Sequence, residues 1–399
     1  MHSCSTRKAV AAFWMILVLC VMGAERGLPA ELPPAADDAA PAAAPSQDSG
    51  QTEPAAAAPS EPSPSEPVNK PELSREMVAL RDRARTTIRT VAGQSLSMRE
   101  HTPAQLMDAC LAFGCTLEIR DGSAAGKNTS AVGALLWNFN CGGYRLMAID
   151  GGRPLPRVGY GLQQYPSQLL ATLAQARVAT DYEIRIGQYQ GTVADLVEDE
   201  KAACRRGANS PHRLIGLSYY LRDEREWTAA DGETWSISRL AGEELARRAD
   251  PADVQSVHQL YALSLALARE TSRKEPLDET LLRVREYLVK YHDYAFRVQN
   301  ADGSWNEFFF AFQGPSRSEL GALRSTGHIL EWLAMSLPED RLAEPSMVRA
   351  VGYTTSLVSK HAARGTSALS PRDFESVMHA IRALSIYDAR FFAPQSAQP

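Results

Sequence analysis

Hydrophobic residues recur along the chain in a short pattern that begins with a histidine. After each histidine, an aliphatic residue stands at +2, a leucine at +5, and serine or alanine at +6. Offsets +2, +5 and +9 share one side of an α-helix, while apolar residues at +4 and +7 occupy the opposite side. Helices with apolar groups on both sides are buried, so the pattern predicts repeated buried helices. The four clear copies begin at His212, His258, His328 and His379.

Two weaker copies extend the repeat toward the N-terminus. Tyr165 takes the place of histidine in one copy, and His101 begins the other, which has Pro103 at +2. Six inner helices that alternate with outer helices predict an all-α fold that closes into an (α/α)6 toroid. The outer helices are predicted from amphipathic segments at residues 192–201, 237–248, 279–299 and 345–361.

Two stretches of the chain do not follow the helical pattern. Residues 138–161 are rich in glycine and irregular, and residues 182–186 alternate like a short strand. We therefore expect a small irregular or β insertion in this part of the toroid.

The first 72 residues differ in composition from the rest of the chain. Two basic residues precede an apolar run at residues 9–24 that ends in small residues, which is typical of a secretory signal peptide. The run is shorter than the roughly 20 residues that span a bilayer, but an uncleaved N-terminal anchor also fits residues 1–24. Residues 25–72 are mostly alanine, proline, serine and glutamate, so we expect a disordered linker. The toroid domain, residues 73–399, is therefore predicted to be exported, as a periplasmic or secreted protein, with a membrane tether if the anchor is retained.

Charge and cysteine content narrow the classes of function. The net charge is −5 with acidic and basic residues interspersed, so a nucleic-acid partner is not expected. Four cysteines lie in the predicted exported domain, where disulfides are permitted and three pairings are open. These cysteines are Cys110, Cys115, Cys141 and Cys204.

A glutamine–glycine–tryptophan motif stands at Gln299, Gly303 and Trp305, and a degenerate copy without the glutamine ends in Gly232 and Trp235. Beside the helical repeats, this motif resembles the repeat of the squalene and hopene cyclases. The resemblance covers about the C-terminal half of the chain and implies the α/α toroid of terpenoid cyclases and protein prenyltransferase β-subunits. It also implies a structural role for the motif, in which glutamine and tryptophan tie outer helices together and glycine makes a turn.

The chain departs from both families at their reactive groups. Terpenoid cyclases use an Asp-x-Asp-Asp acid to protonate an alkene or epoxide, and no such run occurs here. Because an alkene is a very weak base, cyclisation without a strong acid is not expected. The prenyltransferase zinc site needs Asp, Cys and His, but Pro211 separates Cys204 from His212 and no Asp-x-Cys pair exists. We therefore predict neither a metal nor another cofactor.

The repeated histidines are the candidate binding residues. If each begins an inner helix and these helices are parallel, the histidines meet at one mouth of the toroid, with His101 as a further member. Helix N-termini carry partial positive charge, so this mouth suits an anionic, polar or isoprenoid-like ligand. In the alternative interpretation, each histidine hydrogen-bonds a neighbouring repeat and has only a structural role. The predicted ligand-binding residues are His212, His258, His328, His379 and Tyr165.

These patterns favour an exported binding or scaffolding module that does not cyclise terpenoids and whose partner is a small molecule or an envelope component. One alternative is a polysaccharide hydrolase or lyase that uses cleft carboxylates on an (α/α)6 scaffold. A second alternative is a structural envelope protein with a filled barrel. The candidate acids for the hydrolase or lyase are Asp195, Glu198, Asp302 and Glu307.

Overall fold

The computed structural model describes residues 73–122, 125–363 and 365–393. Within these ranges the fold is mainly α-helical with four two-stranded antiparallel sheets, which confirms the prediction of a mainly-α protein. None of the described helices has the length and hydrophobicity required to cross a membrane. The predicted signal peptide or anchor (residues 1–24) and the predicted linker (residues 25–72) lie outside the described residues.

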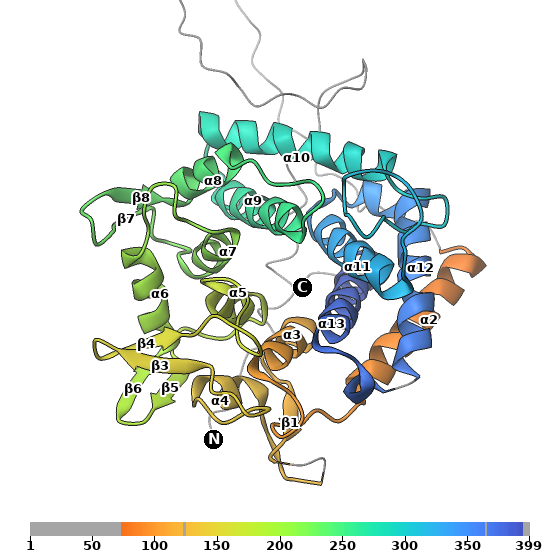
Figure 1. Cartoon of the computed structure of the whole chain (residues 1–399). Coiled ribbons are helices and arrows are strands. Elements are labelled where there is room, and N and C mark those ends of the chain that lie inside the picture. The colour runs from red at the N-terminus through yellow and green to blue at the C-terminus, as the bar shows by residue number, and fades with distance from the viewer. Residues whose placement is uncertain (1–72, 123–124, 364, 394–399) are drawn as a thin grey trace, which may run out of the picture.

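Six helices surround the centre of the molecule (Figure 1). Each inner helix contacts the inner helix that follows it in sequence. The last inner helix, α13, contacts the first, α3. The series of contacts therefore returns to its starting point. These inner helices are α3 (Pro103–Phe113), α5 (Gln168–Gln175), α7 (Pro211–Tyr220), α9 (Val254–Ser272), α11 (Glu319–Ser336) and α13 (Pro371–Tyr387).

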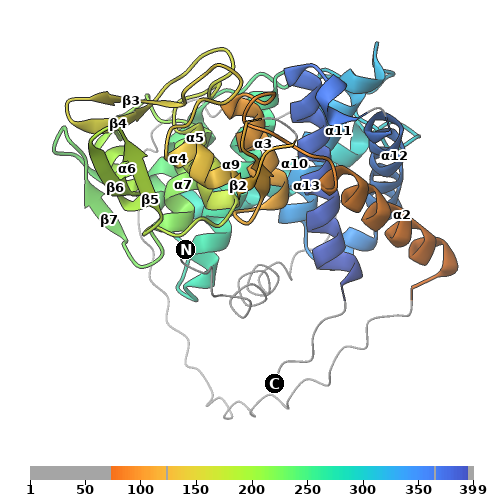
Figure 2. The same ribbon diagram turned by 90° about the horizontal axis from the view of Figure 1, so that it is seen from below.

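Six further helices of the described part lie outside this set (Figures 1 and 2). Among them, α10 contacts α8 and α9, α12 contacts α11 and α13, and α2 contacts α12. Four of these outer helices coincide with the predicted amphipathic segments. They are α2 (Arg75–Ala92), α4 (Ala131–Leu136), α6 (Val193–Ala202), α8 (Ile237–Ala246), α10 (Glu279–Arg297) and α12 (Pro345–Ala362).

Small hairpins connect several inner helices to outer ones. The second strands β2, β6 and β8 each end one residue before an outer helix begins. The β3–β4 hairpin lies within the glycine-rich stretch, and β5 matches the alternating segment, so the expected β insertion takes the form of separate hairpins. The pairs are β1 (Glu118–Arg120) with β2 (Asn128–Ser130), β3 (Met147–Asp150) with β4 (Arg153–Pro156), β5 (Glu183–Ile186) with β6 (Tyr189–Thr192), and β7 (Glu226–Thr228) with β8 (Thr234–Ser236).

Local sequence determines where the inner helices begin. Ser210 caps α7 and Ser370 caps α13 through a hydroxyl that accepts a backbone N–H of the first turn, and both helices have proline as their first residue. A proline at this position loses no helical hydrogen bond. Ser318 caps α11 in the same way, by accepting the N–H of Gly321 at 3.0 Å.

The glutamine–glycine–tryptophan motif joins the end of α10 to the start of α12. Gln299 Nε2 donates to the carbonyls of Gly303 at 3.1 Å and Ser346 at 3.0 Å. Trp305 is fully buried, and its indole N–H donates to a carbonyl of α10 at 2.7 Å. Gly303 has a φ of +94°, and a Cβ there would clash with the backbone of Arg349. The turn therefore needs glycine both for its conformation and for the close approach of α12.

The degenerate motif copy forms the β7–β8 hairpin. Gly232 has a φ of +84° in the loop, where a side chain would extend into open space. Trp235 is fully buried and lies opposite Trp227 across the two strands. This copy therefore anchors a hairpin by its tryptophan pair and does not tie two helices by a glutamine.

None of the four cysteines that the structure describes forms a disulfide, and three of them are buried. Burial raises the pKa of the Cys110 thiol to about 12, so this group is an unreactive part of the core. Among these residues the structure therefore realises none of the three open pairings.

Candidate functional site

A small cavity, here called the central cavity, lies among the inner helices and is lined by all six of them. Its volume is about 50 Å³, which is room for a few water molecules or one small chemical group. Its wall is unusually rich in ionisable groups for the interior of a helical protein. These groups are Asp108, Glu331, Glu375, His212, His258, His328 and His379.

The five predicted binding residues lie side by side in this wall. Tyr165 stacks on His212 with ring centroids 5.2 Å apart, and His212 meets His258 edge to face at 4.9 Å. His258 lies 5.8 Å from His328, which stacks on His379 at 3.8 Å. The repeat pattern thus brings residues more than 200 positions apart into one continuous row of rings.

His101 does not belong to this row. Its ring faces Phe374 at a centroid distance of 5.6 Å, and its Nδ1 pairs with the backbone of Ser97. The prediction that His101 joins the other histidines is therefore wrong. The structural interpretation expects a partner in a neighbouring repeat, whereas the partner of His101 is a backbone group four residues earlier in the chain.

The expectation that every histidine begins its helix is wrong for two of the four. His212 is the second residue of α7 and His258 the fifth of α9, but His328 and His379 are the tenth and ninth residues of their helices. The periodic pattern fixes which side of a helix a residue occupies and does not fix where the cap lies. The dipole of the helix N-terminus therefore acts on the first two positions and not on the centre of α11 or α13.

Two buried imidazole nitrogens of the row lack a hydrogen-bond partner among the described residues. They are Nδ1 of His212 and Nε2 of His328. His328 uses its other nitrogen, Nδ1, for a 2.7 Å contact with the carbonyl of Arg324 one turn earlier in the same helix. Because buried polar atoms without partners are unfavourable by about 1–3 kcal/mol, these nitrogens are the part of the cavity best suited to a further group.

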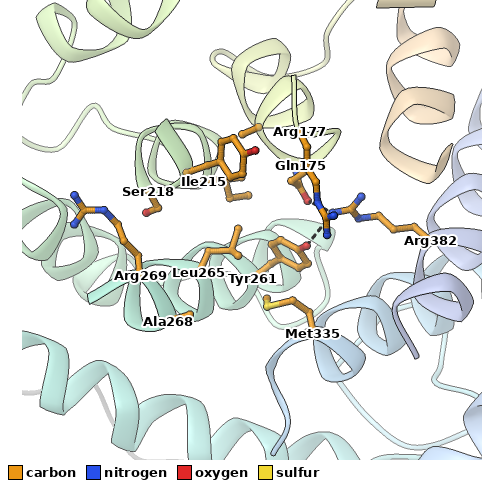
Figure 3. A pocket seen from close by; sticks show the side chains of 12 residues that line it. Gln175, Arg177, Ile215, Ser218, Tyr261, Leu265, Ala268, Arg269, Met335 and Arg382 are labelled. Atoms are coloured by element: carbon orange, nitrogen blue, oxygen red, sulfur yellow. Dashed lines mark hydrogen bonds between the residues drawn. The ribbon is translucent and has the colours of Figure 1, made fainter. Parts of the chain in front are cut away.

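A buried network of charged side chains contacts the row of rings at His379. Glu331 accepts hydrogen bonds from His379 Nδ1 at 2.6 Å and from Arg382 Nε at 2.8 Å. Arg382 also donates to the carbonyl of Leu111. It donates to the hydroxyl of Tyr261 as well (Figure 3). The network thereby joins α11 and α13 to α3 and α9 around the cavity.

A second cavity of about 60 Å³ adjoins the central cavity, and both are lined by Gln175, Ile215 and Tyr261 (Figure 3). Its wall is mostly apolar, with Arg177, Arg269 and Arg382 at its edge. Arg269 donates to two backbone carbonyls beyond the end of α7 and so has a structural task. Both cavities are small, and neither has room for a long isoprenoid chain.

The histidines of the row differ in charge. Burial lowers the pKa of His212 to about 4, and burial with the neighbouring His212, His379 and Arg324 lowers the pKa of His258 well below its ordinary value. Burial and the same kinds of neighbour lower the pKa of His328 in the same way. Burial also acts to lower the pKa of His379, but the carboxylates led by Glu331 raise it overall. His379 therefore holds a proton more readily than the other three histidines of the row.

The pKa of the Asp108 carboxyl group is raised, whereas those of His212, His258 and His328 are lowered. Its side chain is buried on α3, and burial together with the charge of Glu375 raises the pKa of Asp108 to about 8. Asp108 is therefore mostly protonated at neutral pH and can donate a hydrogen bond into the central cavity.

The acids that the sequence proposes for a hydrolase or lyase lie outside both cavities. Asp195 caps α6 by accepting the N–H of Thr192 at 2.7 Å, and Glu198 pairs with Lys201. Asp302 accepts the N–H of Ser304 in the motif turn, and Glu307 accepts the N–H of Arg317 in a loop. All four have local structural partners and none lines either cavity, so the geometry gives that assignment no support.

The three carboxylates of the central cavity escaped the sequence analysis, although a signal exists for each. Glu331 stands three residues after His328, and Glu375 stands four residues before His379. Both spacings place the carboxylate one helical turn from a histidine. Asp108 is an isolated acid in the apolar helix α3. An acid within a buried helix is the signal that would have found them.

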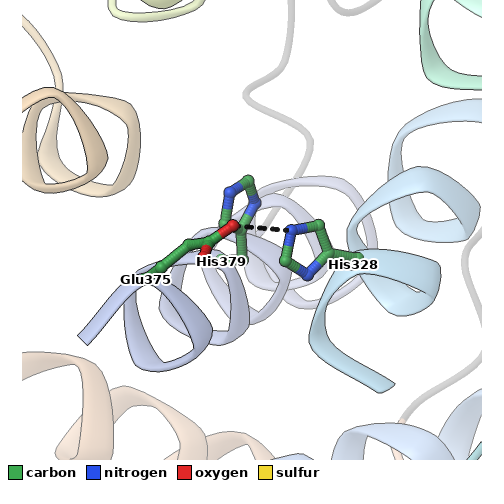
Figure 4. A group of neighbouring side chains, drawn as sticks. All are labelled: His328, Glu375 and His379. Atoms are coloured by element: carbon green, nitrogen blue, oxygen red, sulfur yellow. Dashed lines mark ion pairs between the residues drawn. The ribbon is translucent and has the colours of Figure 1, made fainter. Parts of the chain in front are cut away.

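Three of these groups converge closely enough to be considered as metal ligands. One ligand atom each of His328, Glu375 and His379 lies within 4.8 Å of the others (Figure 4).

Comparison of the chain with protein-family models, with curated proteins and with solved structures found no significant match.

Proposed function

We propose that the protein is an exported binding module built on an (α/α)6 toroid of the terpenoid cyclase type, and that its central cavity holds a small polar ligand. The circular series of inner-helix contacts and the outer helices that cover it support the toroid. The glutamine–glycine–tryptophan turn between α10 and α12 supports the likeness to the cyclase repeat. The apolar run at residues 9–24 supports export.

The observation that carries the proposed binding role is the pair of unpartnered buried nitrogens, His212 Nδ1 and His328 Nε2, in the wall of the central cavity. A ligand with hydrogen-bonding groups would remove the penalty of leaving them unpaired. Of the three kinds of ligand that the sequence suggests, a polar one is favoured over an anionic or an isoprenoid-like one. The carboxylates of Glu331 and Glu375 in the wall oppose an anion, and a volume of about 50 Å³ opposes an isoprenoid.

Native mass spectrometry of the full chain, purified from cells that naturally produce it, tests this proposal. We expect a bound small molecule that is lost in the variant His212→Phe, because phenylalanine preserves the stacking on Tyr165 but removes the ring nitrogens. The matched control is His292→Phe, since His292 is a buried histidine on the outer helix α10 whose partner is Ser336. A wild-type protein that carries no adduct would contradict the proposal and favour the structural envelope protein.

A hydrolase or lyase is the second candidate, carried by different acids from those that the sequence suggests. Asp108 and Glu375 stand on the neighbouring helices α3 and α13 and line the same cavity. Paired carboxyl groups perform acid–base catalysis in glycosidases, but a cavity of about 50 Å³ would have to open before a sugar ring could reach these two. Release of reducing ends from polysaccharides by the wild type, and its loss in Asp108→Asn with unchanged helical circular dichroism, would favour this candidate.

A further inference from the structure

We propose that His328, Glu375 and His379 form a binding site for a divalent transition-metal ion of the Zn²⁺ class, inside the central cavity. The site goes beyond the proposed binding role, which requires no metal. It also differs in ligand set and place from the Asp, Cys and His combination that the sequence lacks.

The spacing of the ligand atoms is close to that of a metal site. His328 Nε2 lies 3.8 Å from Glu375 Oε1, and all three ligand atoms lie within 4.8 Å of one another. Zinc bonds to nitrogen and oxygen measure about 2.0–2.2 Å, so two ligands of one ion lie roughly 3–4 Å apart. To enclose an ion, the side-chain ends would draw together and the stacked rings of His328 and His379 would turn toward it.

The orientation of His328 is the strongest observation. Its Nδ1 lies 2.7 Å from the carbonyl oxygen of Arg324, which can only accept, so the proton of the neutral ring is on Nδ1. Nε2 then carries a lone pair, is completely buried, and is aimed at the Glu375 carboxylate (Figure 4). Two electron-rich atoms that face each other in a buried site repel, and a cation between them would make this arrangement favourable.

His379 has the outer partner that metal-binding histidines usually have. Its Nδ1 donates to Glu331 at 2.6 Å, which leaves Nε2 as the nitrogen for an ion. Glu331 is held in turn by Arg382 at 2.8 Å. A carboxylate behind one histidine and a backbone carbonyl behind the other fix the ring orientations and the tautomers, as in known zinc centres.

The donor set selects the class of metal. Two imidazoles and one carboxylate suit Zn²⁺ and related transition-metal ions, whereas Ca²⁺ and Mg²⁺ prefer ligands that are all oxygen. Three protein ligands leave a fourth position of a tetrahedral ion open toward the cavity. Water or an oxygen of the small polar ligand would occupy this position.

Metal titration of the full chain tests the site. After removal of metal with a chelator, Zn²⁺ binding is measured by calorimetry, and Co²⁺ binding is followed by its visible absorption bands. We expect one ion per chain in the wild type and about a 10-fold to 100-fold weaker affinity in Glu375→Gln, which keeps the side-chain shape. Glu331→Gln, which alters the outer partner of His379 and also removes the ion pair with Arg382, should weaken binding by about 10-fold or more.

The variant His292→Gln is the matched control, because His292 is also buried but lies on α10 with Ser336 as its partner. It should bind metal like the wild type, and circular dichroism confirms that each variant is folded. A wild type without stoichiometric metal binding, or a Glu375→Gln protein with unchanged affinity, would overturn the inference. The readout is the metal itself, so this result is independent of whether native mass spectrometry finds a small molecule.

Discussion

Replacing Arg382 by methionine removes the central cation of the buried network while preserving most of the side-chain volume. The side chain of Arg382 is 11% exposed and that of its partner Glu331 is 5% exposed. Its guanidinium also donates to the carbonyl of Leu111 and to the hydroxyl of Tyr261. The substitution therefore removes one ion pair and leaves three further acceptors without this donor, the third being Gln175 Oε1.

The expected loss of stability follows from the burial of this pair. Removing one partner of a buried ion pair typically lowers the free energy of unfolding by about 3–5 kcal/mol, because the remaining charge is uncompensated. His379 still donates to Glu331 in the variant, which reduces the penalty. We therefore expect Arg382→Met to lower the free energy of unfolding by about 3 kcal/mol, the lower end of this range.

Urea unfolding followed by circular dichroism measures this loss. The matched control is Lys360→Met, because the ion pair of Lys360 with Glu319 is about half exposed on both sides. Exposed pairs contribute about 0–1 kcal/mol, so the control should change little. Adding Glu331→Gln to Arg382→Met should restore part of the stability by removing the uncompensated charge. A loss in Arg382→Met no larger than in Lys360→Met would refute the reasoning.

Two further substitutions test the packing of the outer helices. Gly303→Ala should lower the free energy of unfolding by about 1–3 kcal/mol more than Gly232→Ala. Both glycines have positive φ, but only Gly303 lies against the backbone of another segment. Equal losses of stability in chemical denaturation would contradict this explanation. Burial raises the pKa of the Glu244 carboxyl to about 7, above its ordinary 4.5, against the opposing effect of Arg247. The folded state then holds a proton that the unfolded state releases, so stability falls as the pH rises from about 4.5 to 7, by on the order of 3 kcal/mol. Glu244→Gln should therefore raise the melting temperature at pH 8 but not at pH 4, and a gain independent of pH would show that the charge is not the cause.

The side of each inner helix was predictable from the sequence, and the helix starts were not. The spacing of leucines after His258 and His328 places both histidines on the same wall, where their rings lie 5.8 Å apart. The cap of α11 is Ser318, ten residues before His328, in a segment without the repeat pattern. Caps depend on short polar contacts with the backbone, and hydrophobic periodicity carries no information about them.

The charged part of the central cavity was harder to predict for a different reason. Glu331 and His379 are 48 positions apart, and Arg382 reaches the carbonyl of Leu111 across 271 positions. Only the meeting of α13 with α3 and α11 brings these groups together. The outer helix α2 also escapes the repeat pattern, because its buried residues are few and lie among arginines.

The contact between α13 and α3 has a consequence for how the protein is made. Synthesis proceeds from the N-terminus, so the final inner helix emerges long after its neighbour α3, and the place that it fills stays open until then. A nascent chain in that state exposes the apolar flanks of both neighbours to water and to other chains. Helices α3 and α11 therefore gain their full packing only once α13 is in place.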